Sequence, residues 1–156
     1  MNQGRFVALA LMIAVLAFVA VNTRADDHKK PEVEYLKSPG TEDMNLPFSA
    51  AVRVGNLMFL SGQLGLVPGT RELAEGGIQP ETRQTMENIA ATLEDFCSSI
   101  DNVVKCTVFL ADMDEWGAMN EVYRTFFENA PARSALGASG LALGAQVEIE
   151  CIAVVD

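Results

Sequence analysis

Histidine is almost absent from this sequence, because His28 is the only one among 156 residues. A metal centre built on several histidines is therefore excluded, and a serine-histidine-aspartate triad would depend on a residue near the amino terminus. Basic side chains are scarce too: 11 lysines and arginines face 21 aspartates and glutamates, for a formal charge of −10. Two of the bases and none of the acids lie in residues 1–25, so the rest of the chain carries −12. This balance argues against binding to nucleic acid or to an anionic membrane surface.

Cysteine is sparse as well. The three cysteines, Cys97, Cys106 and Cys151, form an odd count and do not make a disulfide framework. Each lies in an apolar stretch, so we interpret them as small core residues, although one pair could still form in an oxidising compartment. The sequence has no Cys-x-x-Cys pair, and the glycine-containing stretch at 65–69 lacks the lysine and the glycine spacing of a phosphate loop.

Apolar residues are plentiful, at 49% of the chain, which is ample for a packed core. The first 25 residues are predicted to be a secretory signal peptide. An apolar run spans residues 6–21, Arg5 precedes it, and Thr23-Arg24-Ala25 follows with small residues at the cleavage positions. The run is shorter than the ~20 residues that a membrane-spanning helix needs. We expect an exported protein, periplasmic or secreted, that leaves the membrane after cleavage; an uncleaved signal anchor is the alternative.

Residues 26–45 are interpreted as a leader segment, because they are charged, contain two prolines and show little periodicity. His28 lies in this segment and is interpreted as part of a solvated tail, with a metal-binding terminus as the alternative. The length then leaves one domain, at residues 46–156.

The domain begins with a predicted β-hairpin, in which residues 51–54 and 57–60 flank Gly55-Asn56. Residues 80–97 predict a helix, because Pro80 suits a first turn and apolar residues recur every three or four positions. The predicted stripe of this helix consists of Met86, Ile89, Ala90, Leu93, Phe96 and Cys97.

A β-branched run at 103–110 predicts a strand, and Asp112 with Glu115 predicts a capping box for a second helix. Pro131 ends that helix, residues 132–136 can form a strand, and 147–155 predicts the last strand by its alternation. The apolar face of the second helix is predicted to hold Trp116, Met119, Tyr123 and Phe126.

This order of elements predicts a two-layer α+β domain, with two helices on one face of a mixed sheet. Two helices cover only one face of the sheet. The uncovered face predicts self-association.

Two features could carry chemistry. Arg133 follows a helix-ending proline in a predicted strand, and its planar fork matches a carboxylate; a surface charge or a structural ion pair is the alternative. Glu148 and Glu150 share one face of the last strand, and a pair with a basic residue on the next strand is their alternative. These residues alone predict a small exported acidic domain that binds a carboxylate.

Several stretches together resemble the RidA (YjgF-like) family of reactive-intermediate deaminases, and their order and spacing agree from about residue 35 to residue 156. The stretches are Pro47-Phe48-Ser49, Gly55-Asn56, Ser61-Gly62-Gln63, residues 82–89, residues 103–110, Asn120-Glu121-Val122-Tyr123, Pro131-Ala132-Arg133-Ser134 and Val147-Glu148-Ile149-Glu150. The resemblance implies the chorismate-mutase-like (YjgF-like) fold, assembled as a homotrimeric barrel with clefts between subunits.

The resemblance also implies an activity: hydrolysis of enamines and imines of the 2-aminoacrylate type to 2-keto acids and ammonia, without metal or cofactor, as in a 2-iminobutanoate/2-iminopropanoate deaminase. By this resemblance Arg133 grips the substrate carboxylate, and Glu148 holds or activates the attacking water. Ser61 and Asn120 match polar residues of the cleft, and Phe48 matches its aromatic wall. The alternatives within the same family are a trimer that binds small carboxylates without turnover and a chaperone-like trimer.

The sequence departs from the family pattern at two positions. Phe48 stands where many deaminases have a tyrosine, so that hydroxyl is absent. Ala135 stands where many have a cysteine, so a thiol is absent from the site. The departures bear on the rate and the substrate more than on the reaction class.

Overall fold

The structure is a computed structural model that describes residues 30–39 and 45–155. Nearly all of them belong to one unit, Glu32–Asp156; of the unit Met1–Pro31 only Lys30 and Pro31 are described, and neither lies in a helix or strand. The predicted signal peptide (1–25) and His28 lie outside the described residues. Within the described part, no helix combines the length and apolar character needed to cross a bilayer.

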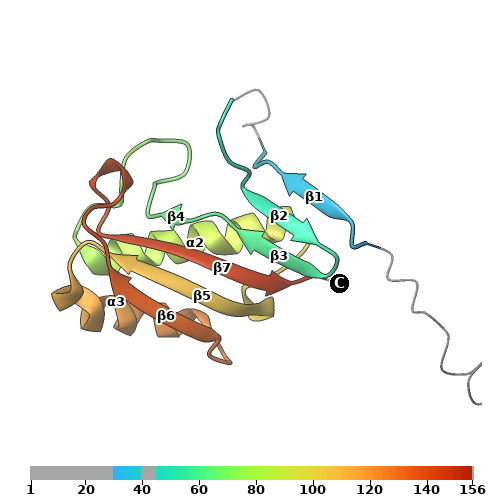
Figure 1. The fold of residues 1–156 in the computed structure, drawn as a ribbon. Coiled ribbons are helices and arrows are strands. Elements are labelled where there is room, and N and C mark those ends of the chain that lie inside the picture. The colour runs from blue at the N-terminus through green and yellow to red at the C-terminus, as the bar shows by residue number, and fades with distance from the viewer. Residues whose placement is uncertain (1–29, 40–44, 156) are drawn as a thin grey trace, which may run out of the picture. The chain divides into compact units, whose positions relative to one another are not determined.

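The described residues form a mixed sheet in the order β1-β2-β3-β7-β5-β6, and β4 also pairs with β7 (Figure 1). Only β5 and β6 run parallel, joined by a crossover through a helix; every other pair is antiparallel. The strands are β1 (Val33–Leu36), β2 (Ala51–Val54), β3 (Leu57–Leu60), β4 (Gln63–Leu64), β5 (Val103–Leu110), β6 (Ala132–Gly137) and β7 (Val147–Val154).

The predicted hairpin is confirmed: β2 and β3 pair antiparallel, and Gly55 turns the chain with a φ of 60° that favours glycine. The leader segment, however, contains a strand. β1 pairs with β2 along Val33–Leu36, so the sheet starts earlier than residue 46, where the domain was predicted to begin. The strand has four residues, and only Leu36 is partly buried, so it leaves almost no apolar alternation in the sequence.

Two helices cover one face of the sheet, α2 (Ile78–Asp95) and α3 (Trp116–Tyr123), as Figure 1 shows. The predicted stripe of α2 is confirmed at its centre, because Met86, Ile89 and Leu93 are all fully buried. Cys97 is the exception. The helix ends at Asp95, and Cys97 takes a left-handed φ of 61° and is exposed, so it is not a core residue.

The second helix confirms part of its predicted apolar face. Met119 and Tyr123 are buried, but Trp116 is 41% exposed at the first turn of α3. Asp112 caps a short turn before the helix by accepting a hydrogen bond from the Asp114 N–H at 2.9 Å, one residue earlier than a capping box requires.

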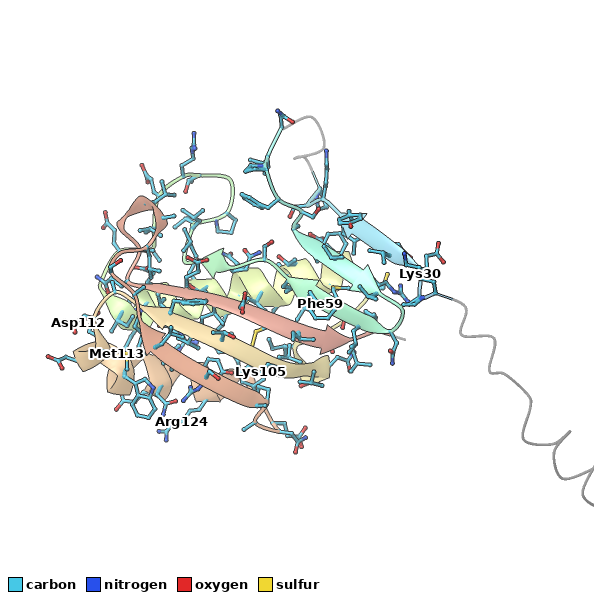
Figure 2. The ribbon with its side chains drawn as sticks, viewed as in Figure 1. Lys30, Phe59, Lys105, Asp112, Met113 and Arg124 are labelled. Carbon is cyan, nitrogen blue, oxygen red and sulfur yellow. A yellow bond between two sulfur atoms is a disulfide. The ribbon has the colours of Figure 1, made fainter. Side chains whose placement is uncertain are left out.

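The last strand alternates as predicted. Val147, Ile149, Cys151 and Ala153 are buried toward the helices, and the residues between them are partly or wholly exposed. On the other face of the sheet the side chains of Phe59 and Lys105 point away from the helices (Figure 2). Phe59 is 41% exposed, and no described element covers it. The sheet therefore has one face that no described element covers, as the sequence predicts.

A disulfide joins the two central strands. Cys106 on β5 and Cys151 on β7 are directly opposite each other, their Cα atoms are 4.2 Å apart, and both side chains are buried. The prediction that these two cysteines are core residues is confirmed, and the possible pair is formed. The bond closes a loop across 45 residues and links the strand before α3 to the strand that carries Glu148.

We expect the double variant Cys106→Ala/Cys151→Ala to lose roughly 2–4 kcal/mol of unfolding free energy, because the closed loop no longer restricts the unfolded chain. Thermal melting of the oxidised wild type and the variant measures this loss. Cys97→Ala is the matched control, since Cys97 is exposed and unbonded and should change stability by less than about 0.5 kcal/mol. Equal melting temperatures for the double variant and the wild type would contradict the prediction.

Candidate active site

Arg133 is held at the sheet edge by groups from α3. It lies on β6 opposite the buried Cys106, which places its side chain on the helix-covered side of the sheet. Its Nη1 donates a hydrogen bond to Asn120 Oδ1 at 2.8 Å, and its Cζ lies 4.7 Å from the centre of the Tyr123 ring. The ring of Trp116 lies 5.7 Å away. An amide and two aromatic rings thus orient the guanidinium without neutralising its charge.

No carboxylate of the described residues lies within ion-pair distance of Arg133. The structural ion pair that was the alternative for this residue is therefore absent from that part of the chain. Arg133 and Asn120 instead line a cavity of about 290 Å³, together with Tyr123, Arg124 and Phe127. A cationic fork with an open cavity beside it is suited to a carboxylate ligand.

Tyr123 supports this arrangement as a neutral ring. Burial raises the pKa of its phenol to about 12, although the positive charge of Arg133 partly opposes this rise. Its hydroxyl is buried and has no hydrogen-bond partner among the described residues. The tyrosine therefore stays uncharged at any physiological pH, and its contribution to Arg133 is the face of its ring.

Glu148 lies in a second hollow, of about 310 Å³, which Phe48, Ser61 and Gly62 also line. The chain leaves room for the carboxylate at Gly62, because a Cβ at that position would collide with the Glu148 side chain. The Ser61 hydroxyl donates its proton to the Ser49 carbonyl oxygen at 2.7 Å, so its lone pairs remain available to accept a hydrogen bond. Phe48 is 59% exposed at the rim. This hollow combines a carboxylate, a hydroxyl acceptor and an aromatic wall.

A buried glutamate outside the predicted site residues fixes the backbone next to Glu148. Glu81 lies in the first turn of α2 and is 3% exposed, and its Oε1 accepts from the Gln146 N–H at 2.8 Å and more weakly from the Val147 N–H at 3.4 Å. The sequence carried a signal for it: Glu81 lies four residues before Thr85 and eight before Ile89, on the buried stripe of the helix.

The predicted site residues therefore form two groups. Arg133 meets Asn120 on the helix-covered side of the sheet, whereas Glu148 belongs with Ser61 and Phe48. The alternation of β7 turns Glu148 away from the helices, since its neighbours Val147 and Ile149 are the buried ones. Within one copy of the chain, Arg133 and Glu148 lie on opposite sides of the sheet.

The other carboxylate of the motif, Glu150, shares the open face of the sheet with Glu148 and lies opposite Thr107 on β5. Lys105 on the same face donates to the Ser134 hydroxyl at 2.9 Å, and no described base lies within ion-pair distance of either glutamate. The alternative that this pair is neutralised by the next strand is thus not seen. The described residues contain no cluster of three or more metal-ligating side chains of the histidine, cysteine or carboxylate type.

Fold and site together define a small two-layer α+β protein with a cavity lined by Arg133 at its sheet edge and a hollow lined by Glu148 on the other side of the sheet. A family model described as Endoribonuclease L-PSP matches residues 41–155. The chain is 43% identical over 109 residues to the 2-iminobutanoate/2-iminopropanoate deaminase of Mus musculus, covering 69% of this chain and 81% of that protein. It is 36% identical over 137 residues to the chloroplastic Reactive Intermediate Deaminase A of Arabidopsis thaliana, covering 87% and 72%.

Comparison with a solved structure points to the same family. A Yersinia pestis protein of the conserved Rid family, YyfA, superposes with a TM-score of 0.73 at 32% identity, over 80% of this chain and all of that one. The chain belongs to the RidA family of reactive-intermediate deaminases. The resemblance seen in the sequence is confirmed, and so is the fold class of a mixed sheet with two helices on one face.

Proposed function

We propose that this chain hydrolyses enamine and imine intermediates of the 2-aminoacrylate type to 2-keto acids and ammonia. The proposal rests mainly on the surroundings of Arg133. This arginine has no carboxylate partner in the described residues, and Asn120 and Tyr123 orient it beside an open cavity. A structural arginine would be neutralised, whereas a substrate-binding arginine needs a free anion-binding edge. The names of the relatives point to the same reaction class.

In this proposal the two groups of residues divide the work. Arg133 binds the substrate carboxylate through its fork and so positions the C=N carbon. Glu148 accepts a proton from a water while the water oxygen bonds to that carbon, and Ser61 accepts a hydrogen bond that orients the water or the substrate. The π pair of C=N moves to the nitrogen, which takes this proton from Glu148 and gives a carbinolamine. The hydroxyl proton of the carbinolamine then passes to the nitrogen, the C=O bond forms as the C–N bond breaks with its electron pair on nitrogen, and a keto acid and ammonia leave. Positioning supplies most of the rate, because the imine carbon is already electrophilic.

The separation of Arg133 from Glu148 also bears on how copies of the chain assemble. Because Arg133 and Glu148 lie on opposite sides of one sheet, a small substrate reaches both only when they come from different copies. The open face, on which Phe59 is exposed, supplies a contact surface for such copies. We infer a homotrimer whose sheets form a central barrel, with each site in the cleft between two subunits.

Sedimentation of the purified protein at micromolar concentration should therefore give a particle of three chain masses. The reason is the uncovered sheet face, which a closed ring of three copies buries. Phe59→Lys, on that face, should shift the particle toward monomer. A wild-type protein that sediments as one chain would contradict the proposed trimer.

The activity is tested by generating imines from several amino acids with an amino-acid oxidase and measuring keto-acid release with and without the protein. We expect the protein to accelerate release from 2-imino acids. Binding of pyruvate without any acceleration would instead identify a carboxylate-binding protein, which is the alternative within the family.

We also propose that the protein works outside the cytoplasm, after removal of residues 1–25. The apolar run behind Arg5 supports export, and the disulfide between Cys106 and Cys151 suits an oxidising compartment. The amino-terminal residue of the protein recovered from the source cells decides this: cleavage after Ala25 leaves Asp26 at the terminus, and an intact Met1 contradicts cleavage.

A further inference from the structure

A third cavity adjoins the hollow that holds Glu148. It measures about 330 Å³, which is within the range of small-ligand pockets. Phe48, Ser61, Gly62 and Leu64 line both cavities, so the larger one opens beside the reacting end of the proposed site. None of the roles given so far to site residues accounts for this cavity.

The walls of this cavity are mainly hydrocarbon. Its large apolar lining residues are Leu46, Phe48, Leu64, Leu66 and Leu143. Three of them are unusually exposed for their type: Leu46 at 45%, Phe48 at 59% and Leu143 at 59%. Exposed apolar side chains gathered around one concavity, rather than scattered singly, are typical of a ligand pocket.

Leu143 adds a second observation. It takes a left-handed φ of 58°, a conformation that suits glycine or asparagine and is rarely occupied by leucine. Burial of the side chain does not offset this backbone strain, because the side chain remains 59% exposed at the cavity. A strained residue with its apolar side chain at a pocket is a feature that functional sites retain.

From this geometry we infer that the preferred substrates are imino acids with a large apolar side chain, of the kind derived from leucine, methionine or phenylalanine, and not the smallest member of the class. The inference rests on the proposed function, in which Arg133 of one copy holds the carboxylate and Glu148 of another faces the C=N carbon. The side chain of the substrate would then extend past Phe48 into the 330 Å³ cavity. Phe48 itself favours this, since it offers hydrocarbon where a tyrosine would offer a hydroxyl.

The test compares imines made by amino-acid oxidases from leucine, phenylalanine, alanine and glutamate, using the full-length chain. We expect kcat/KM for the leucine-derived imine to exceed that of the alanine-derived imine by about 10-fold or more, because each buried methylene contributes to discrimination. Lys37 also lines the cavity, so the glutamate-derived imine tests whether charge rather than hydrocarbon decides. An equal or better rate with the alanine-derived or glutamate-derived imine overturns the inference.

Variants then locate the effect. Leu143→Asn keeps a residue that tolerates the left-handed backbone but removes the apolar wall, and it should lower the leucine-to-alanine ratio of kcat/KM by about 10-fold. Leu46→Asn, at a second exposed wall position, should act in the same direction. Val67→Asn is the control, because Val67 is a similarly exposed apolar residue that does not line the cavity; its ratio should stay within about 2-fold of wild type. A ratio unchanged in both wall variants refutes the assignment.

A binding measurement separates failure of the pocket from failure of the activity. Trp116 is the only tryptophan and lies 5.7 Å from Arg133, so its fluorescence reports a ligand held there. We expect 4-methyl-2-oxopentanoate to bind about 10-fold more tightly than pyruvate, and Leu143→Asn to remove the difference. Tighter binding of the larger acid without turnover of any imine would refute the deaminase and leave the apolar pocket; equal binding of the two acids would refute the pocket.

Discussion

Arg133→Ala should lower kcat/KM for imine hydrolysis by about 10²-fold or more, since the substrate loses its bidentate anchor and is free to misorient. Its melting temperature and sedimentation should stay close to those of the wild type. The reason is that Arg133 hydrogen-bonds only to Asn120 in the described part of the chain and neutralises no carboxylate there. Imine-hydrolysis rates and melting curves on the same preparations measure both effects.

Arg133→Lys is the matched control for the fork. A lysine keeps the positive charge but cannot make two parallel hydrogen bonds, so it should recover little of the lost rate. Pyruvate titrations followed by Trp116 fluorescence should show weak binding in both variants. Full turnover in Arg133→Ala, or a large loss of stability together with the loss of activity, would refute its role as the substrate anchor.

Glu148→Gln should reduce the rate by about 10²- to 10⁴-fold, because an amide cannot accept the proton of the attacking water. Pyruvate binding should persist, since the variant leaves Arg133 untouched. The glutamine is nearly isosteric with the glutamate and fits the space that Gly62 leaves open, so the fold is retained. A Glu148→Gln protein that has lost both turnover and pyruvate binding would contradict the division of roles.

Mixing the two inactive variants gives the sharpest test of the shared site. If each site takes Arg133 from one copy and Glu148 from its neighbour, unfolding and co-refolding equal amounts of Arg133→Ala and Glu148→Gln should leave roughly one site in four with both wild-type residues. Activity should then return to roughly a quarter of the wild-type value, from two proteins that are each almost inactive. No recovery, with mixed trimers shown to form, would place both residues of a site in one copy.

The parts of the fold that could be predicted from the sequence are those with a strong local period. The eight-residue strand β7 alternates cleanly, and the stripe of α2 recurs at helical spacing, so both were identified from their own residues. β1 could not be found in this way, because it is a short, exposed strand held by pairing with β2. Trp116 continues the apolar stripe of its helix, yet tertiary structure turns it toward Arg133 instead of the core.

The site was predictable only in part, for a related reason. Arg133 and Glu148 stand out as residue types in the sequence, but Asn120 acquires its partner across 13 residues and Glu81 across 65. Such contacts depend on how β6, β7 and the helices pack, which no local window contains. One feature of the site does follow from the local sequence: the alternation of β7 places Glu148 on the face opposite the helices.

The hydrogen bonds of Glu81 offer protein engineering a way to adjust the site from outside it. The carboxylate accepts hydrogen bonds from the N–H groups of Gln146, just before β7, and of Val147, its first residue, and Glu81 lines neither candidate pocket. Glu81→Asp shortens this side chain by one methylene. It would draw the start of β7 toward α2 and shift the position of the Glu148 carboxylate by a fraction of an ångström. A laboratory programme that seeks to tune this centre for a new substrate thus has a control point outside it, where a change alters alignment and leaves the chemistry of the reacting groups intact.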